Sequence, residues 1–201
     1  MHVRLSLPLA LTLIRLIVAP LILPFLVYYL LPFQNFFVHS GLALLSAFVC
    51  LTDFLDGYLA RKYQQVTVLG KLLDPIADKF FFSAMLIALV AIHKFYFFWA
   101  ILLIGREFFI SGLRAFAAQR QISVDVSFFG KLKTTFQGIL LFIVIISPSS
   151  WTDQFGVYAW GLFEVVVLII TLFFSFYSAY KYFEGVLRKI RQLLPPKGGS
   201  L

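Results

Sequence analysis

The sequence predicts an all-α integral membrane protein, in which residues 1–201 form a single domain of six transmembrane helices. Of these 201 residues, 61% are hydrophobic and 13% are charged, and the mean hydropathy is +0.94. A soluble domain is usually about half apolar and about a quarter charged, so this composition excludes a soluble enzyme. Disordered chains contain few aromatic residues, which make up 18% here, so disorder is excluded too. Six spans of roughly 20 residues each fit within the length and leave short loops.

Polar breaks divide the chain into six apolar runs, each of which we expect to form one helix. The expected spans are residues 7–31, 36–61, 72–93, 96–119, 128–146 and 158–187. In the first run, Pro8 suits an opening turn, whereas Pro20 and Pro24 lie inside the run and are expected to bend the helix. The second and third runs are separated only by the short stretch 62–69, which makes their helices antiparallel neighbours.

The later breaks are as clear as the early ones. Lys94 lies in the short break between the third and fourth runs, and the basic stretch 120–133 covers the break between the fourth and fifth. Pro148 and the two serines that follow it mark a turn before the sixth run.

The basic residues indicate the orientation of the six helices. The chain has 17 Lys and Arg against nine acidic residues, a net charge of +8. The basic residues gather at Arg4 and in the stretches 61–79, 120–133 and 181–197. The intervening loops 32–40 and 148–157 contain none, and the loop between the third and fourth spans contains only Lys94. Cytoplasmic loops carry this excess of Lys and Arg, so we expect both termini in the cytoplasm. Anionic membrane lipids therefore explain the charge, and no nucleic-acid partner is expected.

The C-terminal stretch 181–191 has two interpretations. It carries four basic residues among apolar ones. These charges either serve only to set the topology, or belong to a helix end that leans on an anionic membrane surface.

A cluster of carboxylates is the strongest sign of function. Asp53, Asp56, Asp74 and Asp78 are four of the nine acidic residues and lie within 26 positions. Each pair has the spacing of one helical face, and the short connection lets the pairs converge. Such charges cost several kcal/mol each near hydrocarbon, so we expect Mg²⁺ or Mn²⁺, which prefer oxygen ligands, to neutralise them. The alternative is that the aspartates form interfacial ion pairs with neighbouring Arg and Lys side chains.

Small residues accompany the aspartates. Gly57 and Ala60 share the helical face of Asp53 and Asp56 and leave room for a flat, phosphate-bearing ligand. Arg61 supplies a fixed positive charge for a phosphate group.

These residues form a motif that resembles the signature of the CDP-alcohol phosphatidyltransferase family. The motif reads Asp53-Phe-Leu-Asp56-Gly57-Tyr-Leu-Ala60-Arg61, eight residues, and then Gly70-Lys-Leu-Leu-Asp74-Pro-Ile-Ala-Asp78. The resemblance implies that Asp53, Asp56, Asp74 and Asp78 bind one or two Mg²⁺ or Mn²⁺ ions, and that Asp78 is also the catalytic base. It further implies that the CDP group is bound by Asp53, Gly57, Ala60, Arg61 and Gly70.

A second set of residues suggests how an acceptor alcohol is bound. The chain contains Gly105-Arg106-Glu107, Ser111-Gly112-Leu113-Arg114 and Gly130-Lys131-Leu132-Lys133-Thr134-Thr135-Phe136-Gln137. Glu107 and Arg114 fall on one helical face, so we expect them to pair and to leave Arg106 as a spare cation. Arg106, Arg114, Lys131, Lys133 and Thr134 would then bind an acceptor phosphate. The alternative is that Arg106 and Glu107 merely neutralise each other and that the lysines set topology.

These strings resemble the branch of the family whose acceptor is glycerol 3-phosphate, although Leu9 stands where that branch usually carries Asn. The resemblance implies transfer of the phosphatidyl group from CDP-diacylglycerol to glycerol 3-phosphate, giving phosphatidylglycerophosphate and CMP. It also implies the bacterial cytoplasmic (inner) membrane, an active site that faces the cytoplasm, and a homodimer as an open alternative to the monomer. Other acceptors, namely an inositol phosphate, serine or phosphatidylglycerol, remain alternatives. A cation-coupled transporter is disfavoured, because the chain lacks an internal repeat and its aspartates lie toward one end of the spans.

Overall fold

The computed structural model describes residues 7–33, 35–62, 68–122, 128–147 and 154–193. Within these ranges it contains six long helices, one short 3-10 helix and no strand, so the prediction of an all-helical fold is confirmed. The elements are α1 (Leu7–Leu30), η1 (Leu31–Phe33), α2 (Phe36–Lys62), α3 (Val68–Ala91), α4 (Phe97–Gln119), α5 (Phe128–Ile146) and α6 (Gln154–Leu193).

Two helices extend beyond the expected ranges. Helix α3 begins at Val68 rather than at residue 72, and α6 covers 40 residues, Gln154–Leu193, rather than 158–187. Hydropathy marks where an apolar run ends, but Lys, Arg, Gln and Leu are all good helix formers. The basic stretch after residue 187 therefore continues the helix that the apolar stretch begins.

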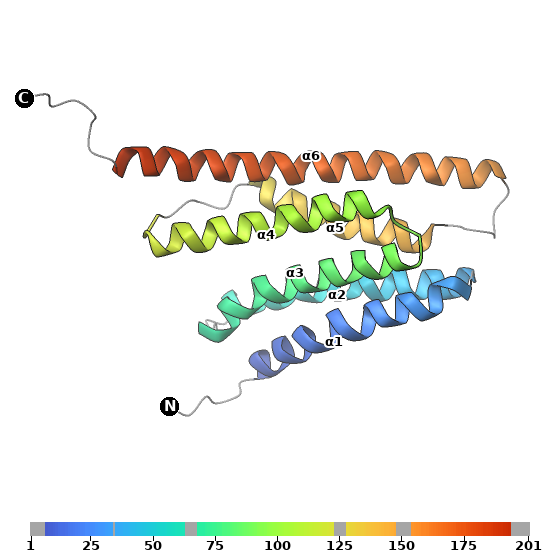
Figure 1. Ribbon diagram of the computed structural model, residues 1–201. Coiled ribbons are helices and arrows are strands. Elements are labelled where there is room, and N and C mark those ends of the chain that lie inside the picture. Colours follow the sequence, from blue (N-terminus) through green and yellow to red (C-terminus); the bar gives the residue numbers. More distant parts are fainter. Residues whose placement is uncertain (1–6, 34, 63–67, 123–127, 148–153, 194–201) are drawn as a thin grey trace, which may run out of the picture.

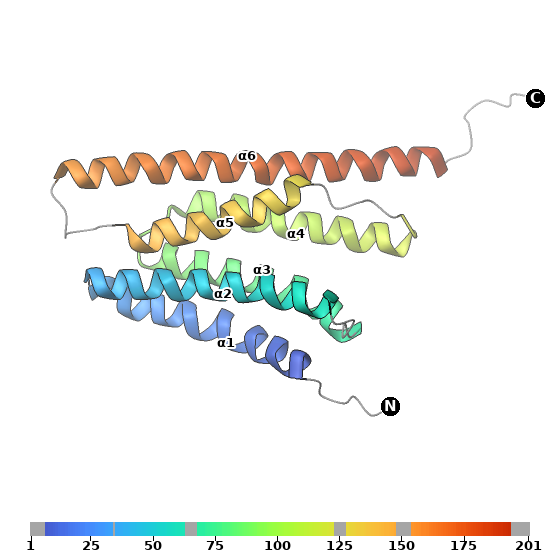
Figure 2. The same cartoon turned by 180° about the vertical axis from the view of Figure 1, so that it is seen from behind.

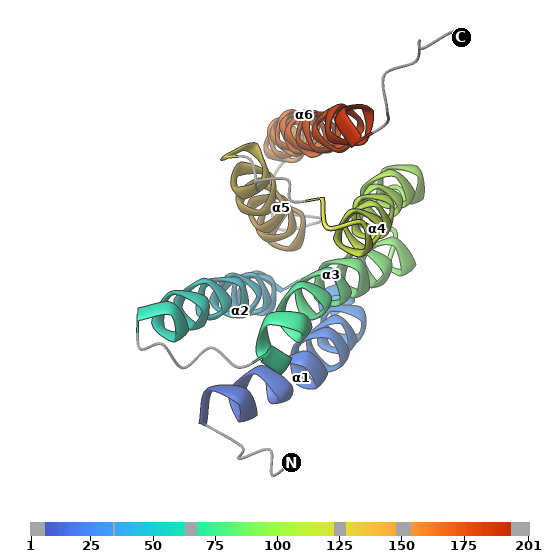
Figure 3. The same ribbon diagram turned by 90° about the vertical axis from the view of Figure 1, so that its left-hand side faces the viewer.

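The helices run side by side along one common direction (Figure 1 and, from behind, Figure 2). Helices α1, α3 and α5 begin toward the same end of the bundle at which α2, α4 and α6 finish. We call this the charged end, because it contains the aspartate motif on α2 and α3. Seen end-on, α1 to α3 form one half of the bundle and α4 to α6 the other (Figure 3).

Apolar side chains from all six helices meet in one core. Helix α1 packs mainly against α3, α5 packs against both α2 and α6, and α4 packs against α6. Representative buried side chains, one from each helix, are Val27, Leu42, Met85, Leu103, Ile145 and Val167. This packing joins the two halves of the bundle and holds the polar faces of α3, α4, α5 and α6 toward one another.

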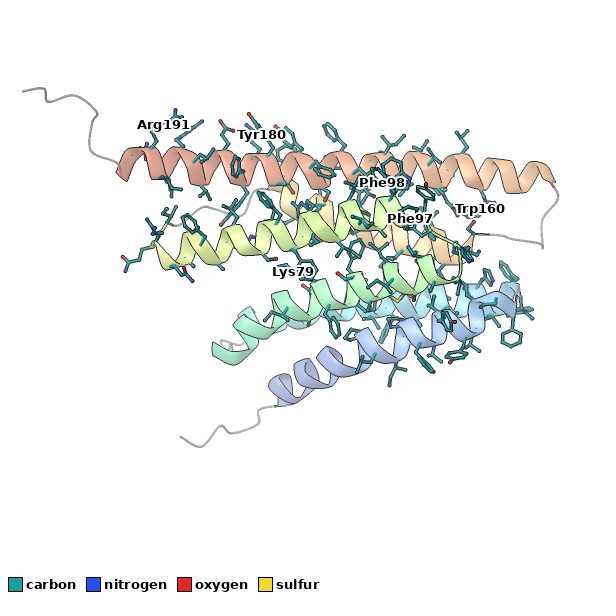
Figure 4. The ribbon with its side chains drawn as sticks, in the orientation of Figure 1. Lys79, Phe97, Phe98, Trp160, Tyr180 and Arg191 are labelled. Carbon is teal, nitrogen blue, oxygen red and sulfur yellow. The ribbon has the colours of Figure 1, made fainter. Side chains whose placement is uncertain are left out.

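The outer surface is also apolar. Phe97 and Phe98 are about half exposed and lie at the end opposite the charged end (Figure 4). Among the described residues, two helical segments are long and apolar enough to cross a membrane, namely Phe129–Ile146 and Ala159–Gln192. Two further apolar segments are shorter than these, Ala19–Phe33 and Phe36–Leu51. Apolar helices with exposed aromatic side chains are typical of membrane proteins. The number of spans and the position of the termini stay predictions.

Candidate functional site

A charged cavity lies among α3, α4, α5 and α6, in the half of these helices nearer the charged end. Its volume is about 290 Å³. Its charged lining consists of Asp78, Lys79, Arg106, Glu107, Arg114, Lys131 and Lys133. Five of these side chains are basic and two are acidic, so the described lining favours an anionic ligand.

A second, apolar cavity of about 580 Å³ adjoins it among α1, α2, α3 and α5. It is lined mainly by Ala, Val, Leu, Ile and Phe side chains, including Ala19, Leu51, Phe81, Leu141 and Phe142. The two cavities share Asp78, Phe82, Thr134 and Gln137. Asp78, which is exposed, therefore lies where a basic polar space meets an apolar one.

The five predicted acceptor-phosphate residues all line the charged cavity together with Asp78. They are Arg106, Arg114, Lys131, Lys133 and Thr134. The helices thus bring together residues that are far apart in the sequence. One part of the alternative is met, because Arg106 and Glu107 form an ion pair at 3.0 Å. The other part, that the lysines at the start of α5 set the topology, stays a prediction.

The remaining predicted site residues are placed only by their helices. Asp53, Asp56, Gly57, Ala60 and Arg61 lie in the last three turns of α2, and Gly70 and Asp74 lie in the first two turns of α3. Both segments are at the charged end, but these side chains lie outside the described part of the structure. Among the side chains that are described, no group of three or more His, Cys, Asp or Glu residues could hold a metal ion.

One carboxylate oxygen organises the floor of the charged cavity. Oε1 of Glu107 accepts hydrogen bonds from Arg106 Nη1 at 3.0 Å, Lys133 Nζ at 2.6 Å and Gln137 Nε2 at 3.1 Å. All four side chains are buried. Because hydrogen bonds to ionised groups are strong in a low-dielectric interior, this oxygen fixes side chains of α4 and α5 in one arrangement.

Arg106 extends the same network to α6. Its Nε donates to the carbonyl oxygen of Ser175 at 2.9 Å, and its Nη2 donates to Oγ of Ser178. A guanidinium has five N–H donors, and this network uses three of them. Arg106 therefore serves first to join α4 to α6, and within the described part of the chain two of its N–H groups are not used in this network.

The predicted pairing of Glu107 with Arg114 is wrong. Glu107 instead pairs with Arg106, its neighbour in sequence, and with Lys133 from α5. Arg114 is exposed, and its guanidinium lies 5.4 Å from the ring centroid of Tyr182 on α6. Two helical turns separate Glu107 from Arg114, about 10 Å along the axis, whereas α5 brings Lys133 alongside. Arg106 is consequently not a spare cation.

Arg114 and Lys131 are the more accessible cations of the cavity. Both side chains are exposed, while Lys133 is buried and engaged by Glu107. Thr134 Oγ1 donates to the carbonyl oxygen of Lys131 at 2.8 Å, so in this conformation its hydroxyl offers lone pairs rather than a proton. A phosphate entering the cavity would therefore meet Arg114 and Lys131 first.

Sequence reasoning missed several residues of the cavity. Lys79, Ser178 and Tyr182 line the cavity, and Ser175 accepts a hydrogen bond from Arg106, but none of the four is among the site residues that the sequence predicts. The serines and Tyr182 have i, i+3 and i+7 spacing, which places them on one face of an otherwise apolar helix. Polar side chains in such a stripe face the interior of a membrane bundle, and that signal could have identified them.

Comparison with known proteins agrees with the motif. The family model described as CDP-alcohol phosphatidyltransferase matches residues 5–177. A Rickettsia felis protein named CDP-diacylglycerol–glycerol-3-phosphate 3-phosphatidyltransferase is 35% identical over 185 residues, which are 92% of this chain and 97% of the relative. Proteins with the same name from Pectobacterium atrosepticum and Salmonella typhimurium are 35% identical over 189 residues and 36% identical over 171 residues. These matches cover 90% and 82% of this chain, and 94% and 88% of the respective relatives. With the aspartate motif on α2 and α3 and a family match over most of its length, the chain belongs to the CDP-alcohol phosphatidyltransferase family.

Proposed function

We propose that the protein transfers the phosphatidyl group of CDP-diacylglycerol to the sn-1 hydroxyl of glycerol 3-phosphate, releasing CMP and phosphatidylglycerophosphate. The position of Asp78 between the charged and the apolar cavity is the observation that carries this proposal. The reaction joins a small dianionic alcohol to a lipid, and it needs a polar, basic space beside an apolar one. The names of the relatives point to the same two substrates.

The lining of the charged cavity suits the acceptor. Arg114, Lys131 and Lys133 would bind its phosphate, with Arg106 and Thr134 nearby. Serine, which has no net charge and a single carboxylate, would not need so many cations. The glycerol backbone would then extend toward Asp78 at the shared edge of the two cavities.

Asp78 would act as the general base. Its carboxylate takes the proton of the sn-1 hydroxyl, and the hydroxyl oxygen forms a bond to the phosphorus that carries the diacylglycerol. The bond from this phosphorus to the bridging oxygen breaks, and CMP leaves with that oxygen. The apolar cavity would accommodate part of the lipid donor, since its lining offers mainly hydrocarbon contacts.

The other motif residues would hold the nucleotide and the metal. Four carboxylates on two adjoining helix ends are a donor set that suits Mg²⁺ or Mn²⁺, so Asp53, Asp56, Asp74 and Asp78 would bind one or two ions. Such ions, when bound, neutralise charge on the pyrophosphate of the donor. Asp53, Gly57, Ala60, Arg61 and Gly70 would contact the CDP group.

We further propose that the charged end faces the cytoplasm in the inner membrane of a bacterium, with six spans and both termini on that side. The alternation of basic and nearly neutral loops supports this orientation. The water-soluble acceptor would then enter the site, and the water-soluble product CMP would leave it, on the cytoplasmic side.

Turnover by the purified protein tests this function. With CDP-diacylglycerol, Mg²⁺ and labelled glycerol 3-phosphate, we expect release of CMP and transfer of the label into lipid. Chelation with EDTA should abolish turnover, and added Mg²⁺ or Mn²⁺ should restore it, because the pyrophosphate charge is otherwise not neutralised. Turnover with an inositol phosphate or serine, but none with glycerol 3-phosphate, would overturn the acceptor assignment. Full activity in the presence of EDTA would overturn the metal assignment.

Replacing Lys131 by Gln should weaken acceptor binding with little effect on folding. Lys131 is an exposed cation of the cavity, and its loss removes a charge-assisted hydrogen bond. We expect the KM for glycerol 3-phosphate to rise about tenfold, which corresponds to about 1.4 kcal/mol. Arg120→Gln is the matched control, because Arg120 is an exposed cation after the end of α4 that stacks on Phe116 and does not line the cavity. An equal rise in KM for both variants would indicate a general effect of surface charge instead.

A further inference from the structure

Helix α6 is much longer than a membrane span requires. Its 40 residues correspond to about 60 Å, about twice the roughly 30 Å thickness of the hydrocarbon core. At the charged end it reaches beyond the end of α4 (Figures 1 and 2). If the hydrocarbon core begins at Ala159, where the apolar segment of α6 begins, about 20 residues span it, and the last three turns of α6, residues 180–192, reach the level of the lipid headgroups.

These turns combine basic and apolar side chains on their exposed surface. The basic residues are Lys181, Arg188, Lys189 and Arg191, and the exposed large apolar residues are Tyr180, Phe183 and Leu187. Glu184 is the single acidic residue between 180 and 192, and it pairs with Lys181 at 3.4 Å and with Arg188 at 3.0 Å. The stretch therefore keeps a net charge of +3.

The inner face of the same turns is fixed against α4. Val186 is buried together with Ala117 and Ile122, and Ile190 packs beside them. This contact holds the helix in place and directs the opposite face outward. Tyr180 and Arg191 lie on the side of α6 that faces away from α4 and α5 (Figure 4).

We propose that the last three turns of α6 form a binding surface for the headgroups of anionic phospholipids. Helices that bind at the membrane interface combine exposed apolar side chains with cations. Their apolar side chains enter the boundary between headgroups and acyl chains, and their cations contact the lipid phosphates. The length of α6 lets this surface extend past a span of about 20 residues that begins at Ala159, and packing against α4 holds it in place. The inference does not depend on the reaction proposed above.

Selectivity for lipids can be measured directly by electron paramagnetic resonance. The full chain is reconstituted in phosphatidylcholine vesicles with a spin-labelled phosphatidylglycerol or a spin-labelled phosphatidylcholine as the probe. We expect the wild type to favour the anionic probe, with about a fivefold contribution for each cation near the surface. The preference should fall in high salt, because screening weakens surface electrostatics. Inorganic phosphate should weaken it no more than chloride of equal ionic strength, since a free anion lacks the apolar contact.

The variant that tests the surface carries Arg188→Gln, Lys189→Gln and Arg191→Gln, and we expect it to lose most of the preference. The matched control carries Arg188→Lys and Arg191→Lys, which preserve the charge and should keep the preference. If the triple variant does not fold, as judged by its thermal unfolding, the three single Gln variants should each lose part of it. The proposal would be overturned if the wild type and the folded Gln variants preferred the anionic probe equally, or if the wild type showed no preference for it. These charges would then have a topogenic role only. Turnover with CDP-diacylglycerol and glycerol 3-phosphate, measured on the same samples, reports separately on the proposed reaction.

Discussion

Asp78→Asn should reduce turnover by about three orders of magnitude, because a general base contributes about 10²- to 10⁴-fold to the rate. The amide has the size of the carboxylate but cannot take the proton of the acceptor hydroxyl. Asp78 lies at the edge shared by the two cavities, so its loss should affect the chemical step more than the binding of either substrate. Steady-state release of CMP measures turnover, and equilibrium binding of CDP-diacylglycerol measures the donor site.

The controls separate a carboxylate that acts in the reaction, as base or as metal ligand, from a merely structural one. Asp78→Glu keeps an ionisable carboxylate one methylene farther from the helix, and we expect activity between those of the wild type and the Asn variant. Donor binding by Asp78→Asn should stay measurable. Activity within tenfold of the wild type in a folded Asn variant would remove Asp78 as the base.

Glu107→Ala should lower the free energy of unfolding by about 3–5 kcal/mol, the usual effect of removing one partner from a buried ionic group. Its Oε1 accepts hydrogen bonds from Arg106, Lys133 and Gln137, and all of these side chains are buried. Without the carboxylate, two buried cations lose their common counter-charge. Reversible unfolding in detergent micelles, followed by circular dichroism, measures the change.

Glu184→Ala supplies a matched comparison. Glu184 also bridges two cations, Lys181 and Arg188, but its side chain is partly exposed and its partners are more so. Exposed ion pairs contribute about 0–1 kcal/mol, so the unfolding free energy should change little. Equal destabilisation by the two alanine variants would show that burial of the Glu107 network does not determine its contribution.

The sequence predicts the helices well and their ends less well. Apolar runs bounded by polar breaks place all six helices, because a helix satisfies every backbone hydrogen bond within an apolar environment. The extension of α6 to Leu193 was missed because hydropathy changes at the basic stretch while helix propensity does not. Membrane boundaries and helix boundaries are therefore different quantities, and hydropathy reports the first.

For the candidate site, the sequence indicates which residues line the charged cavity better than it indicates their contacts. The residues expected to bind the acceptor all line one cavity, and their role there stays a prediction, whereas spacing along α4 suggests the wrong partner for Glu107. The actual contacts join residues 26 and 30 positions apart through Lys133 and Gln137, and 69 positions apart through Arg106 and the Ser175 carbonyl. Such pairs depend on which helices become neighbours, and periodicity within one helix carries no information about that.

The position of Asp78 between two cavities has a consequence for inhibition. Under the proposed function, the soluble acceptor and the lipid donor occupy separate volumes that meet at four shared residues. A compound that fills only the apolar cavity would compete with CDP-diacylglycerol and leave the acceptor free to bind, whereas a phosphonate in the charged cavity would have the opposite pattern. A molecule that links the two groups across Asp78 would exclude both substrates at once, and its affinity would reflect both sites through their effective concentration.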